Sequence, residues 1–166
     1  YQELLAIDSR PSPAFFAPST RDLGTDPIPA SNYTSAAFFE REKEKMWFRT
    51  WQYACGEDEI SESGDTHVYE LLGQQVLVVR QADGSIRAFK NICRHRGRKL
   101  VNHSACKTSF RCAYHGLTWG LDGKLIENPF AWDFPQLGPD DIPLFNVRCE
   151  SWAGLIFINL DPDARP

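Results

Sequence analysis

Two short pairs of cysteine and histidine constrain this chain more than any other feature of its sequence. The first pair is Cys93-Arg94-His95, and after sixteen intervening residues the second is Cys112-Ala113-Tyr114-His115. Alternate residues of an extended segment point to the same side, so one short loop can present a thiolate and an imidazole together. We attribute the extra residue of the second pair to a turn at Gly116. A strand over Lys107 to Arg111 can return the second loop to the first, which makes the four side chains candidate metal ligands.

The kind of metal follows from how the ligand types are mixed. Structural zinc sites commonly use Cys-x2-4-Cys and His-x3-5-His, in which each short motif donates like ligands. Here each loop donates one cysteine and one histidine, which suits two metal atoms side by side. Each loop then gives its thiolate to one iron and its imidazole to the other, as in [2Fe-2S] clusters where two histidines replace two cysteines on one iron. The pattern therefore favours an iron-sulfur cluster, with zinc or no metal as the alternatives.

The composition is that of one ordinary soluble domain, with 166 residues, 42% of them hydrophobic and 24% charged. The net charge of -4 argues against a nucleic-acid partner. The sequence has no run of about 18 apolar residues and no basic-then-apolar leader, so neither a membrane span nor export is expected, and a cytoplasmic location is the default. Because the chain begins at Tyr1 and stops at Pro166 directly after an apolar run, we expect a fragment of a longer protein.

The N-terminal part is expected to contain an arm and one helix. Residues 1–33 are rich in Pro, Ser and Asp, and five prolines prevent long regular elements, so an extended arm is predicted. The region 34–50 is predicted to be helical, with a clear helix from Ser35 to Trp47 and Thr34 or Ser35 as its cap. Its apolar side chains are predicted to face a core, and they are Phe38, Phe39, Met46 and Trp47.

From Trp51 onward the sequence pattern has a period of two, which predicts short strands joined by turns. The predicted strands are 51–54, 66–72, 75–81 and 85–91, with a closing pair at 146–149 and 154–160. Asp83-Gly84 and Asp122-Gly123 predict two hairpins, the first leading into the cysteine region and the second leaving it. The segment from Glu127 to Pro143 carries four prolines and is expected to be a long functional or mobile loop. The expected fold class is therefore mainly β.

At the two Cys-His pairs the sequence resembles the Rieske family, whose motif is Cys-x-His, a spacer of about fifteen to seventeen residues, and Cys-x2-His. It looks like the oxygenase branch, the large (alpha) subunit of Rieske non-heme iron ring-hydroxylating oxygenases. The resemblance covers about Tyr33 to Pro166, and its flanks are Phe39 to Trp51, Asn91 to Gly97, Cys112 to Gly123 and Gly154 to Asp161. It implies one N-terminal helix and a Rieske-type antiparallel β-sandwich at 51–161, with a small cluster-binding subdomain of two hairpin-like loops at about 91–126. Residues 162–166 would start a linker to a missing catalytic domain.

The resemblance also implies the site. The [2Fe-2S] ligands would be Cys93, His95, Cys112 and His115, and the residues around the cluster would be Arg96, Gly97, Arg98, Tyr114, Gly116 and Trp119. High-potential Rieske proteins of respiratory complexes have a disulfide between the loops and a serine that hydrogen-bonds a sulfide. The matching positions here hold Arg98, Tyr114 and Leu117. Fewer hydrogen bonds to the sulfides stabilise the reduced cluster less, so a low potential is expected.

The other candidate residues have simpler interpretations. Arg94, Arg96, Arg98 and Lys99 form a basic patch whose expected roles are partner docking and electrostatic stabilisation of the reduced cluster, with simple solvation as the alternative. Tyr114 and Trp119 are expected to shield the cluster by packing. Outside the loops, Cys55, Cys106 and Cys149 are expected to be buried or free thiols, and His67 and His103 ordinary histidines.

In this branch the cluster passes single electrons from a ferredoxin or reductase to a mononuclear Fe(II), held by two histidines and one carboxylate, where dioxygen is activated. After the cluster ligands only His67 and His103 remain, so this chain is expected to be an electron-transfer module that oxygenates nothing alone. The resemblance implies that the parent continues into a catalytic domain and assembles as a ring. In that ring, His115 would face a carboxylate of the neighbouring subunit and serve inter-subunit electron transfer. A stand-alone Rieske ferredoxin and a zinc-stabilised binding module are the alternatives.

Overall fold

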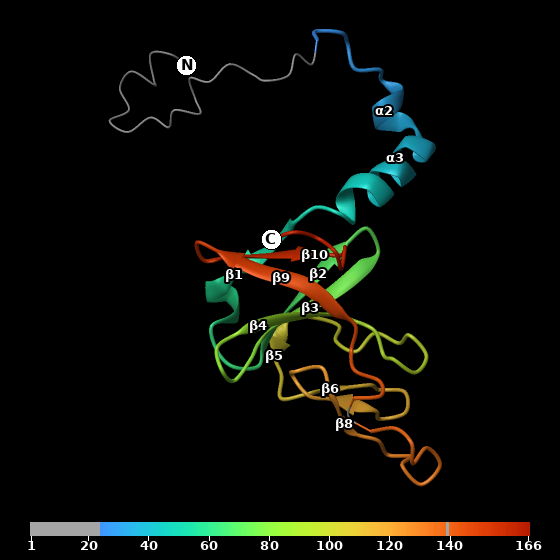
Figure 1. Ribbon diagram of the computed structural model, residues 1–166, viewed down its shortest axis with the longest axis vertical. Coiled ribbons are helices and arrows are strands. Elements are labelled where there is room, and N and C mark those ends of the chain that lie inside the picture. The colour runs from blue at the N-terminus through green and yellow to red at the C-terminus, as the bar shows by residue number, and fades with distance from the viewer. Residues whose placement is uncertain (1–23, 139) are drawn as a thin grey trace, which may run out of the picture.

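The computed structural model describes residues 24–138 and 140–166, so most of the predicted arm lies outside the described residues. Figure 1 shows a helical stretch that extends from one end of a strand-rich body. The helical stretch consists of α2 (Ser31–Thr34), α3 (Ala36–Glu42) and a π-helical turn η2 (Lys43–Trp47). Ser35 caps α3, because its Oγ accepts a hydrogen bond from the backbone N–H of Phe38 at 3.2 Å.

The apolar side chains of this helical stretch do not pack into a core. No residue of α2, α3 or η2 is buried, and Phe39 and Met46 are 42% and 39% exposed. The prediction that they face a core is wrong for the described part of the chain, because the helices project away from the sheet instead of lying across it (Figure 1). The chain enters the body at Trp51, whose indole Nε1 donates to the backbone carbonyl of Arg165 at 2.8 Å.

The body is built around one antiparallel sheet of seven strands in the order β1-β10-β9-β4-β3-β2-β5. These strands are β1 (Gln52–Gly56), β2 (Asp65–Leu71), β3 (Gln74–Arg80), β4 (Ile86–Lys90), β5 (Ala105–Cys106), β9 (Asn146–Trp152) and β10 (Leu155–Asn159), and a 3-10 turn η3 (Glu57–Ile60) follows β1. A second sheet lies at the other end of the body from the helices (Figure 1), and it consists of β6 (Phe110–Arg111), β7 (Thr118–Trp119) and β8 (Leu125–Glu127). The predicted fold class, mainly β with antiparallel strands, is confirmed.

Four hairpin turns set the register of these strands. Asp83-Gly84 joins β3 to β4 and Asp122-Gly123 joins β7 to β8, as predicted. The turn between β2 and β3 is formed by Leu72 and Gly73, with φ of 49° and 80°, and the turn between β9 and β10 by residues 153 and 154, with φ of 51° and 80°. Positive φ at both central residues is the geometry of a type I′ turn. These two turns lack the Asn-Gly or Asp-Gly signal, so the sequence predicted the flanking strands but not the turn type.

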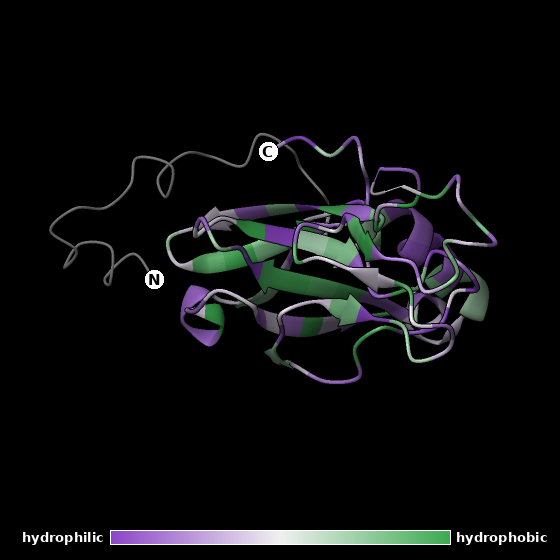
Figure 2. Cartoon of the chain, turned by 90° about the horizontal axis from the view of Figure 1, so that it is seen from below, coloured by the Kyte–Doolittle hydropathy of each residue, from purple (hydrophilic) through white to green (hydrophobic). Residues whose placement is uncertain are grey.

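Two hydrophobic cores lie on opposite faces of β3. Val76 and Val78 belong to one core, whereas Leu77 and Val79 belong to the other, because side chains alternate along a strand. Hydrophobic residues accordingly fill the strands in the middle of the body (Figure 2). The core of Leu77 and Val79 also contains Cys93 and Cys112, so both candidate ligand cysteines are buried among apolar side chains.

In the described part of the chain, no helix has the length and apolar character needed to cross a membrane.

Candidate metal centre

The two loops that carry the Cys-His pairs have the same backbone skeleton. In loop 93–98, the N–H of Cys93 donates to the carbonyl of residue 98 at 2.7 Å, and the N–H of Gly97 donates to the carbonyl of residue 93 at 3.0 Å. In loop 112–117, the N–H of Cys112 donates to the carbonyl of residue 117 at 2.9 Å, and the N–H of Gly116 donates to the carbonyl of residue 112 at 3.0 Å. Each loop is therefore a six-residue turn that closes on its own cysteine.

The sequence suggested that a turn at Gly116, made only by the second loop, causes the unequal spacing of the two Cys-His pairs. The structure shows that this explanation is wrong, because both loops make the same turn. Gly97 and Gly116 hold the same, fifth position of their loops, with φ of 69° and 78°. Histidine stands at the third position of the first loop and at the fourth position of the second. Glycine suits the fifth position because positive φ is costly for a residue with a Cβ atom. Gly116 has a second reason, since a Cβ there would lie 3.0 Å from both Arg111 Nη2 and Pro129 Cγ.

Asn91 closes the base of the first loop, a role that the sequence analysis did not assign to it. Its side chain is 1% exposed. Its Oδ1 accepts hydrogen bonds from the backbone N–H groups of Leu100 at 3.1 Å and Val101 at 3.0 Å, and its Nδ2 donates to the carbonyl of Val101 at 2.6 Å and to Gln75 Oε1 at 3.2 Å. These bonds tie the residues before the loop to those after it. The available signal was an asparagine at the end of a predicted strand and two residues before a ligand motif, because an amide that is buried there must find partners.

Polar contacts from the small sheet support the second loop. Arg111 Nη1 donates to Glu127 Oε2 at 2.9 Å. The hydroxyl of Thr118 lies within hydrogen-bond distance of the same carboxylate oxygen, at 3.1 Å, and of the Gly116 carbonyl, at 2.9 Å. Arg111 and Thr118 are partners across β6 and β7, so the sheet holds the loop at both of its ends.

The four candidate ligands form an inner pair of sulfurs and an outer pair of imidazoles. Cys93 and Cys112 are 4% and 2% exposed, whereas His95 is exposed and His115 is half-buried. The centroids of the two imidazole rings lie 4.8 Å apart. Burial raises the pKa of the Cys93 thiol, the backbone N–H of His95 opposes this rise, and a hydrogen bond with the Cys112 thiol adds to it. The sulfurs are therefore neighbours inside the core while the imidazoles lie toward the surface.

The surroundings of His115 favour the neutral form of its imidazole. Its pKa is lowered most by desolvation, and then by the positive charges of His95 and Arg96. The neutral imidazole is the form that binds a metal. The lowered pKa of His115 therefore favours the form of its imidazole that can bind a metal.

The donor set fits two metal atoms better than one. Among the residues that the structure describes, no three His, Cys, Asp or Glu side chains converge as the ligands of a single ion do. A structural zinc site needs four ligands around one ion. A [2Fe-2S] cluster of mixed ligation instead needs a sulfur pair on one iron and a nitrogen pair on the other. The pair of buried cysteines and the pair of outer histidines match this arrangement of ligands around two irons.

The residues predicted to surround the cluster lie in different layers. Tyr114 is 54% exposed, and its ring centroid lies 3.8 Å from that of His115 at an interplanar angle of 30°. Trp119 is fully buried in the core that contains the cysteines, and its indole Nε1 donates to the carbonyl of Ile142 at 2.8 Å. The remaining loop residues Arg96, Gly97 and Arg98 are exposed, and Gly116 is half-buried. Tyr114 therefore covers an imidazole, whereas Trp119 binds the backbone of segment 127–143 from within the core.

A cavity of about 440 Å³ lies against both imidazoles. Arg94, Arg96 and Leu117 line it from the ligand loops. Its other wall comes from the proline-rich segment 127–143, which contributes Asn128, Phe130, Asp133, Phe134, Leu137 and Ile142. The ring centroid of Phe130 lies 6.2 Å from that of His115 in an edge-on arrangement. The long loop predicted from the prolines therefore forms one wall of the site.

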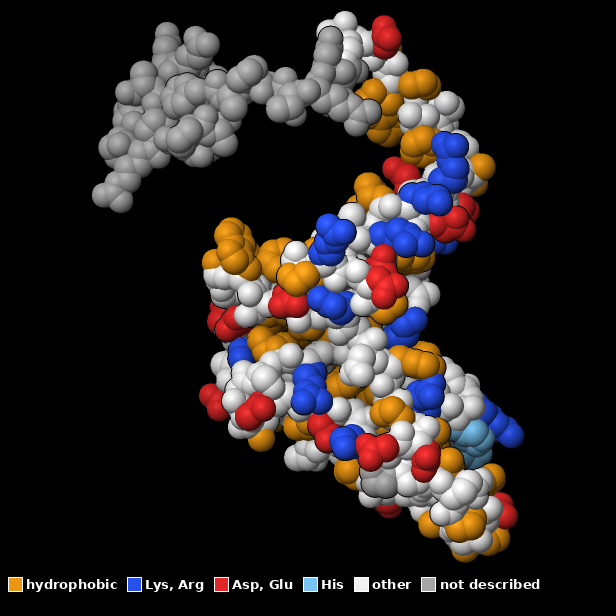
Figure 3. All heavy atoms as spheres, in the orientation of Figure 1, with side chains coloured by type: hydrophobic (Ala, Val, Ile, Leu, Met, Phe, Trp, Pro, Cys, Tyr) orange, Lys and Arg blue, Asp and Glu red, His pale blue; other side chains and the backbone are white. Residues whose placement is uncertain are grey.

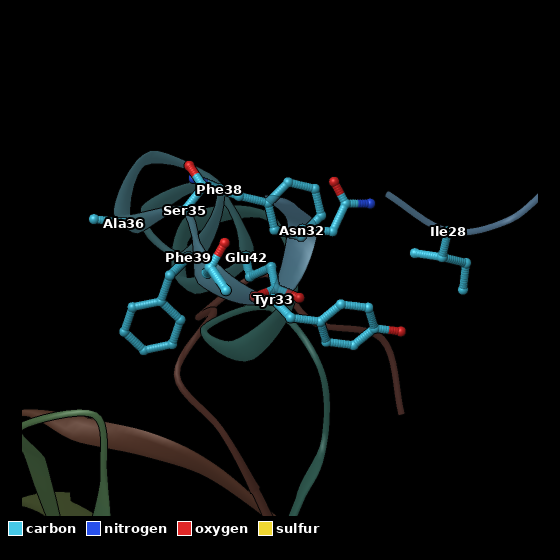
Figure 4. Close-up of a pocket in the computed structure, with 9 residues that line it drawn as sticks. Ile28, Asn32, Tyr33, Ser35, Ala36, Phe38, Phe39 and Glu42 are labelled. Atoms are coloured by element: carbon cyan, nitrogen blue, oxygen red, sulfur yellow. The ribbon is translucent and has the colours of Figure 1, made fainter. Parts of the chain in front are cut away.

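A second hollow, of about 490 Å³, lies along α2 and α3 at the opposite end of the molecule from β6 and β8 (Figures 1 and 4). Figure 4 shows Tyr33 and Phe39 extending to opposite sides of the helical stretch. The ionisable residues of its lining are Tyr33 and Glu42, a pair that provides neither a metal-ligand set nor a catalytic base with a partner.

The cysteines and histidines outside the loops do not join the ligands. All five cysteines are free. Cys55 is buried in the core on the opposite face of β3, and Cys106 is exposed. Burial raises the pKa of both Cys55 and Cys149 to about 12. His67 Nδ1 lies 3.8 Å from Glu59 Oε2, and His103 is exposed in the segment after the first loop.

The sequence profile of a known family matches the part of the chain that contains these two loops. It describes the Rieske [2Fe-2S] domain and matches residues 50–137. The chain belongs to the Rieske [2Fe-2S] domain family. The resemblance drawn from the two Cys-His pairs is thereby confirmed, and the cofactor of this Rieske domain is a [2Fe-2S] cluster.

Oxygenase subunits are among the relatives of this Rieske domain. The carnitine monooxygenase oxygenase subunit of Escherichia coli (strain K12) is 35% identical over 138 residues, which are 82% of this chain and 37% of that protein. The biphenyl 2,3-dioxygenase subunit alpha of Rhodococcus jostii (strain RHA1) is 38% identical over 134 residues, which are 80% of this chain and 29% of that protein. The crystal structure of the quaternary ammonium Rieske monooxygenase CntA superposes with a TM-score of 0.79 at 30% identity, covering 84% of this chain and 40% of that one.

The chain thus spans two-fifths or less of the length of these relatives. It is a Rieske domain homologous to those of oxygenase subunits, which supports an electron-transfer role. The sequence identity of this chain to the monooxygenase subunit, 35%, is close to its identity to the dioxygenase subunit, 38%. The comparison therefore does not indicate a substrate.

Proposed function

We propose that Cys93 and Cys112 bind one iron of the [2Fe-2S] cluster, that His95 and His115 bind the other, and that the domain passes single electrons within a Rieske oxygenase. The observation that carries this proposal is the pair of loops with one backbone skeleton, each presenting a thiol to the core and an imidazole toward the surface. When bound, the cluster supplies reversible one-electron uptake.

The residues around the cluster would have different roles, because the cysteines are buried and the two histidines are exposed to different degrees. The core that contains Cys93 and Cys112 keeps water from the sulfur ligands. His95 is exposed, so its imidazole edge is open to a partner that arrives from solvent. His115 is half-buried and lines the cavity, with the rings of Tyr114 and Phe130 beside it, so less of its imidazole is open to solvent. We propose that His115 is the imidazole that faces a carboxylate of a neighbouring subunit.

In the parent oxygenase, electrons would arrive from a ferredoxin or reductase and leave for a mononuclear Fe(II) in a catalytic domain of the same parent or a neighbouring subunit. That parent would be an oxidoreductase acting with dioxygen. The names of the relatives, which include monooxygenase and dioxygenase subunits, support this proposal.

The surroundings support a low reduction potential. Because all five cysteines are free, no disulfide joins the two loops. Leu117, which is 6% exposed and lines the cavity beside the imidazoles, has no hydroxyl to offer a sulfide. Hydrogen bonds to the sulfurs are one determinant of cluster potential. A measured midpoint potential in the range of respiratory Rieske proteins would contradict this part of the proposal.

The test is an absorption spectrum of the purified protein with analysis of iron and acid-labile sulfide. We expect a coloured protein with two irons and two sulfides, and loss of the chromophore when His95 and His115 are both changed to alanine. The matched control changes His67 and His103 to alanine and should keep the chromophore, because neither lies in a ligand loop. A colourless protein that contains zinc, or a chromophore that survives the first double substitution, would refute the assignment.

A further inference from the structure

The charged residues are distributed very unevenly along this chain. The segment 84–121, which contains both ligand loops, holds eight of the 18 Lys and Arg residues and none of the 22 Asp and Glu residues. The rest of the chain has ten basic and 22 acidic residues. A protein of formal net charge -4 therefore combines a segment of charge +8 with a remainder of charge -12.

Three cations of this segment lie at the surface beside the first imidazole. Arg96, Arg98 and Lys99 are all exposed, and among the described residues none of them forms an ion pair. Figure 3 shows a histidine side chain at the surface next to Lys and Arg side chains. We call Arg96, Arg98 and Lys99 the basic face.

Other cations of the segment are engaged in local contacts. Arg111 pairs with Glu127 at 2.9 Å. The Arg94 guanidinium lies over the Phe145 ring, 3.9 Å from its centroid. Arg96 alone of the basic face has a contact across the loops, since its Nη1 lies 3.5 Å from Tyr114 Oη. That contact holds one positive charge in place beside His115.

The acidic residues of segment 127–143 do not cancel this charge. Glu127 is paired with Arg111, and Asp140 is paired with Lys124 at 2.9 Å. Asp141 Oδ2 accepts a hydrogen bond from the backbone N–H of Gly138 at 2.6 Å. Asp141 keeps its negative charge in this bond, and Asp133, which lines the cavity together with Arg94, is a second carboxylate without an ion pair among the described residues. The four cations of the first loop and its end, Arg94, Arg96, Arg98 and Lys99, outnumber these two carboxylates. The end of the molecule that carries the imidazoles therefore keeps a net positive surface.

We propose that the basic face docks a one-electron redox protein whose contact surface is acidic. The proposal rests on the proposed function, because it assigns a partner to the exposed His95 edge. Complementary charge steers encounter and fixes orientation more than it adds affinity. The negative remainder of the chain repels the same acidic surface, so the charge separation along this chain would turn the partner toward the imidazoles.

Two small redox ions of opposite charge test the sign of this local field. After the absorption spectrum has established the cluster, the protein is reduced with dithionite without oxygen. It is then mixed in a stopped-flow instrument with ferricyanide, an anion, or with hexaammineruthenium(III), a cation. Each ion takes one electron from the reduced cluster, giving ferrocyanide or hexaammineruthenium(II). We expect the ferricyanide rate to fall as ionic strength rises and the ruthenium rate to increase. The opposite pair of slopes, which the net charge of -4 alone predicts, would overturn the proposal.

Charge-reversal variants test whether the attraction of ferricyanide comes from the basic face or from the net charge of the protein. Arg98→Glu with Lys99→Glu should slow ferricyanide by about tenfold or more at low ionic strength and flatten its salt dependence. The matched control, Arg41→Glu with Lys45→Glu, makes the same change of net charge on exposed residues of the helical stretch and should have little effect. Equal effects of the two pairs would show that only net charge matters and would overturn the proposal. If the Arg98→Glu pair fails to retain its cluster, Arg98→Gln with Lys99→Gln provides the same comparison with a smaller expected change.

An acidic polypeptide extends the test from small ions to a protein-like surface. Poly-L-glutamate should slow the ferricyanide reaction of the wild-type protein by occupying the basic face, and this slowing should disappear in the Arg98→Glu, Lys99→Glu variant. Slowing that persists in the variant would place the acidic ligand elsewhere and would contradict the docking surface. Loss of the cluster itself, visible in the absorption spectrum before mixing, would count against the proposed function and not against this charge assignment.

Discussion

The ring of Tyr114 lies 3.8 Å from the ring of His115, centroid to centroid, at an angle of 30°. Tyr114 also approaches Arg96 of the other loop, with its Oη 3.5 Å from Arg96 Nη1. One aromatic residue thus covers a candidate ligand and links the two loops. No disulfide joins these loops, so the ring of Tyr114 contacts both of them without a covalent tie between them.

Replacing Tyr114 by alanine should loosen His115, the proposed iron ligand that its ring covers. Stacking contacts of this kind contribute about 1 kcal/mol, so we expect iron release to a chelator to become roughly fivefold faster. Tyr114→Phe keeps the ring and should release iron at nearly the wild-type rate. The electron paramagnetic resonance spectrum of the reduced cluster should change in the alanine variant and not in the phenylalanine variant. Equal behaviour of the two variants would rule out the ring as the positioning element.

Replacing Asn91 by alanine should destabilise the first loop from its base. The change leaves two backbone N–H groups and one carbonyl without their side-chain partner in a buried place. Unsatisfied buried polar groups cost about 1–3 kcal/mol each, so we expect a loss of about 3 kcal/mol in urea unfolding together with lower cluster content. Asn102→Ala, an exposed position in the same segment, is the control and should change neither. Unchanged stability of the Asn91 variant would show that the loop does not depend on this side chain.

Gly97 and Gly116 form a matched pair for measuring the cost of a steric contact between an added Cβ atom and its neighbours. Both have positive φ, so alanine at either position costs about 1 kcal/mol for the backbone conformation. A Cβ at Gly97 meets nothing within 4 Å, whereas one at Gly116 lies 3.0 Å from Arg111 Nη2 and Pro129 Cγ. Gly116→Ala should therefore cost a further 1–2 kcal/mol in chemical denaturation. Equal costs would mean that Arg111 and Pro129 move aside freely.

Replacing Leu117 by serine should raise the midpoint potential. A hydroxyl at this cavity-lining position can donate to a sulfide, and a hydrogen bond to a charged group contributes about 1.5–3 kcal/mol, which is ~65–130 mV for one electron. Leu117→Ala removes the same bulk without adding a donor and serves as the control. Potentiometric titration measures both, and an equal shift in the two variants would assign the effect to solvent entry instead of to the hydrogen bond.

Stability should decline at alkaline pH because Cys55 is buried and Cys149 is half-buried, both outside the site. Burial raises the pKa of Cys55 and Cys149 from 9.0 to about 12, so the folded chain holds these protons more tightly than the unfolded chain. Their stabilising contribution is complete below about pH 9 and is lost as the pH rises toward 12. Between these limits the free energy of unfolding should fall by about 1.4 kcal/mol per pH unit for each thiol. Urea midpoints measured from pH 8 to 11 should fall less steeply in a Cys55→Ala, Cys149→Ala variant, and Cys106→Ala, at an exposed position, should not alter the slope.

Local patterns in the sequence predicted much of this domain. The period of two from Trp51 onward gave the long strands, and Asp83-Gly84 and Asp122-Gly123 gave two of the hairpins. These features depend on side-chain alternation and on turn chemistry, which act between residues close in sequence. The two Cys-His pairs likewise gave the family, because mixed ligands on each loop are a local signature of two-iron ligation.

Other features depend on residues that are distant in the chain, and only the tertiary structure decided them. Whether Phe39 and Met46 are buried depends on where α3 lies relative to the sheet, and amphipathic composition alone cannot fix that direction. The roles of Asn91 and Tyr114 follow from partners across a loop, at Val101 and Arg96. Segment 127–143 forms a wall of the site through contacts with residues distant in the chain, among them the hydrogen bond from the Trp119 indole Nε1 to the carbonyl of Ile142. The sequence by itself therefore determined the ligand chemistry, while packing between distant segments determined which side chains support, cover and surround it.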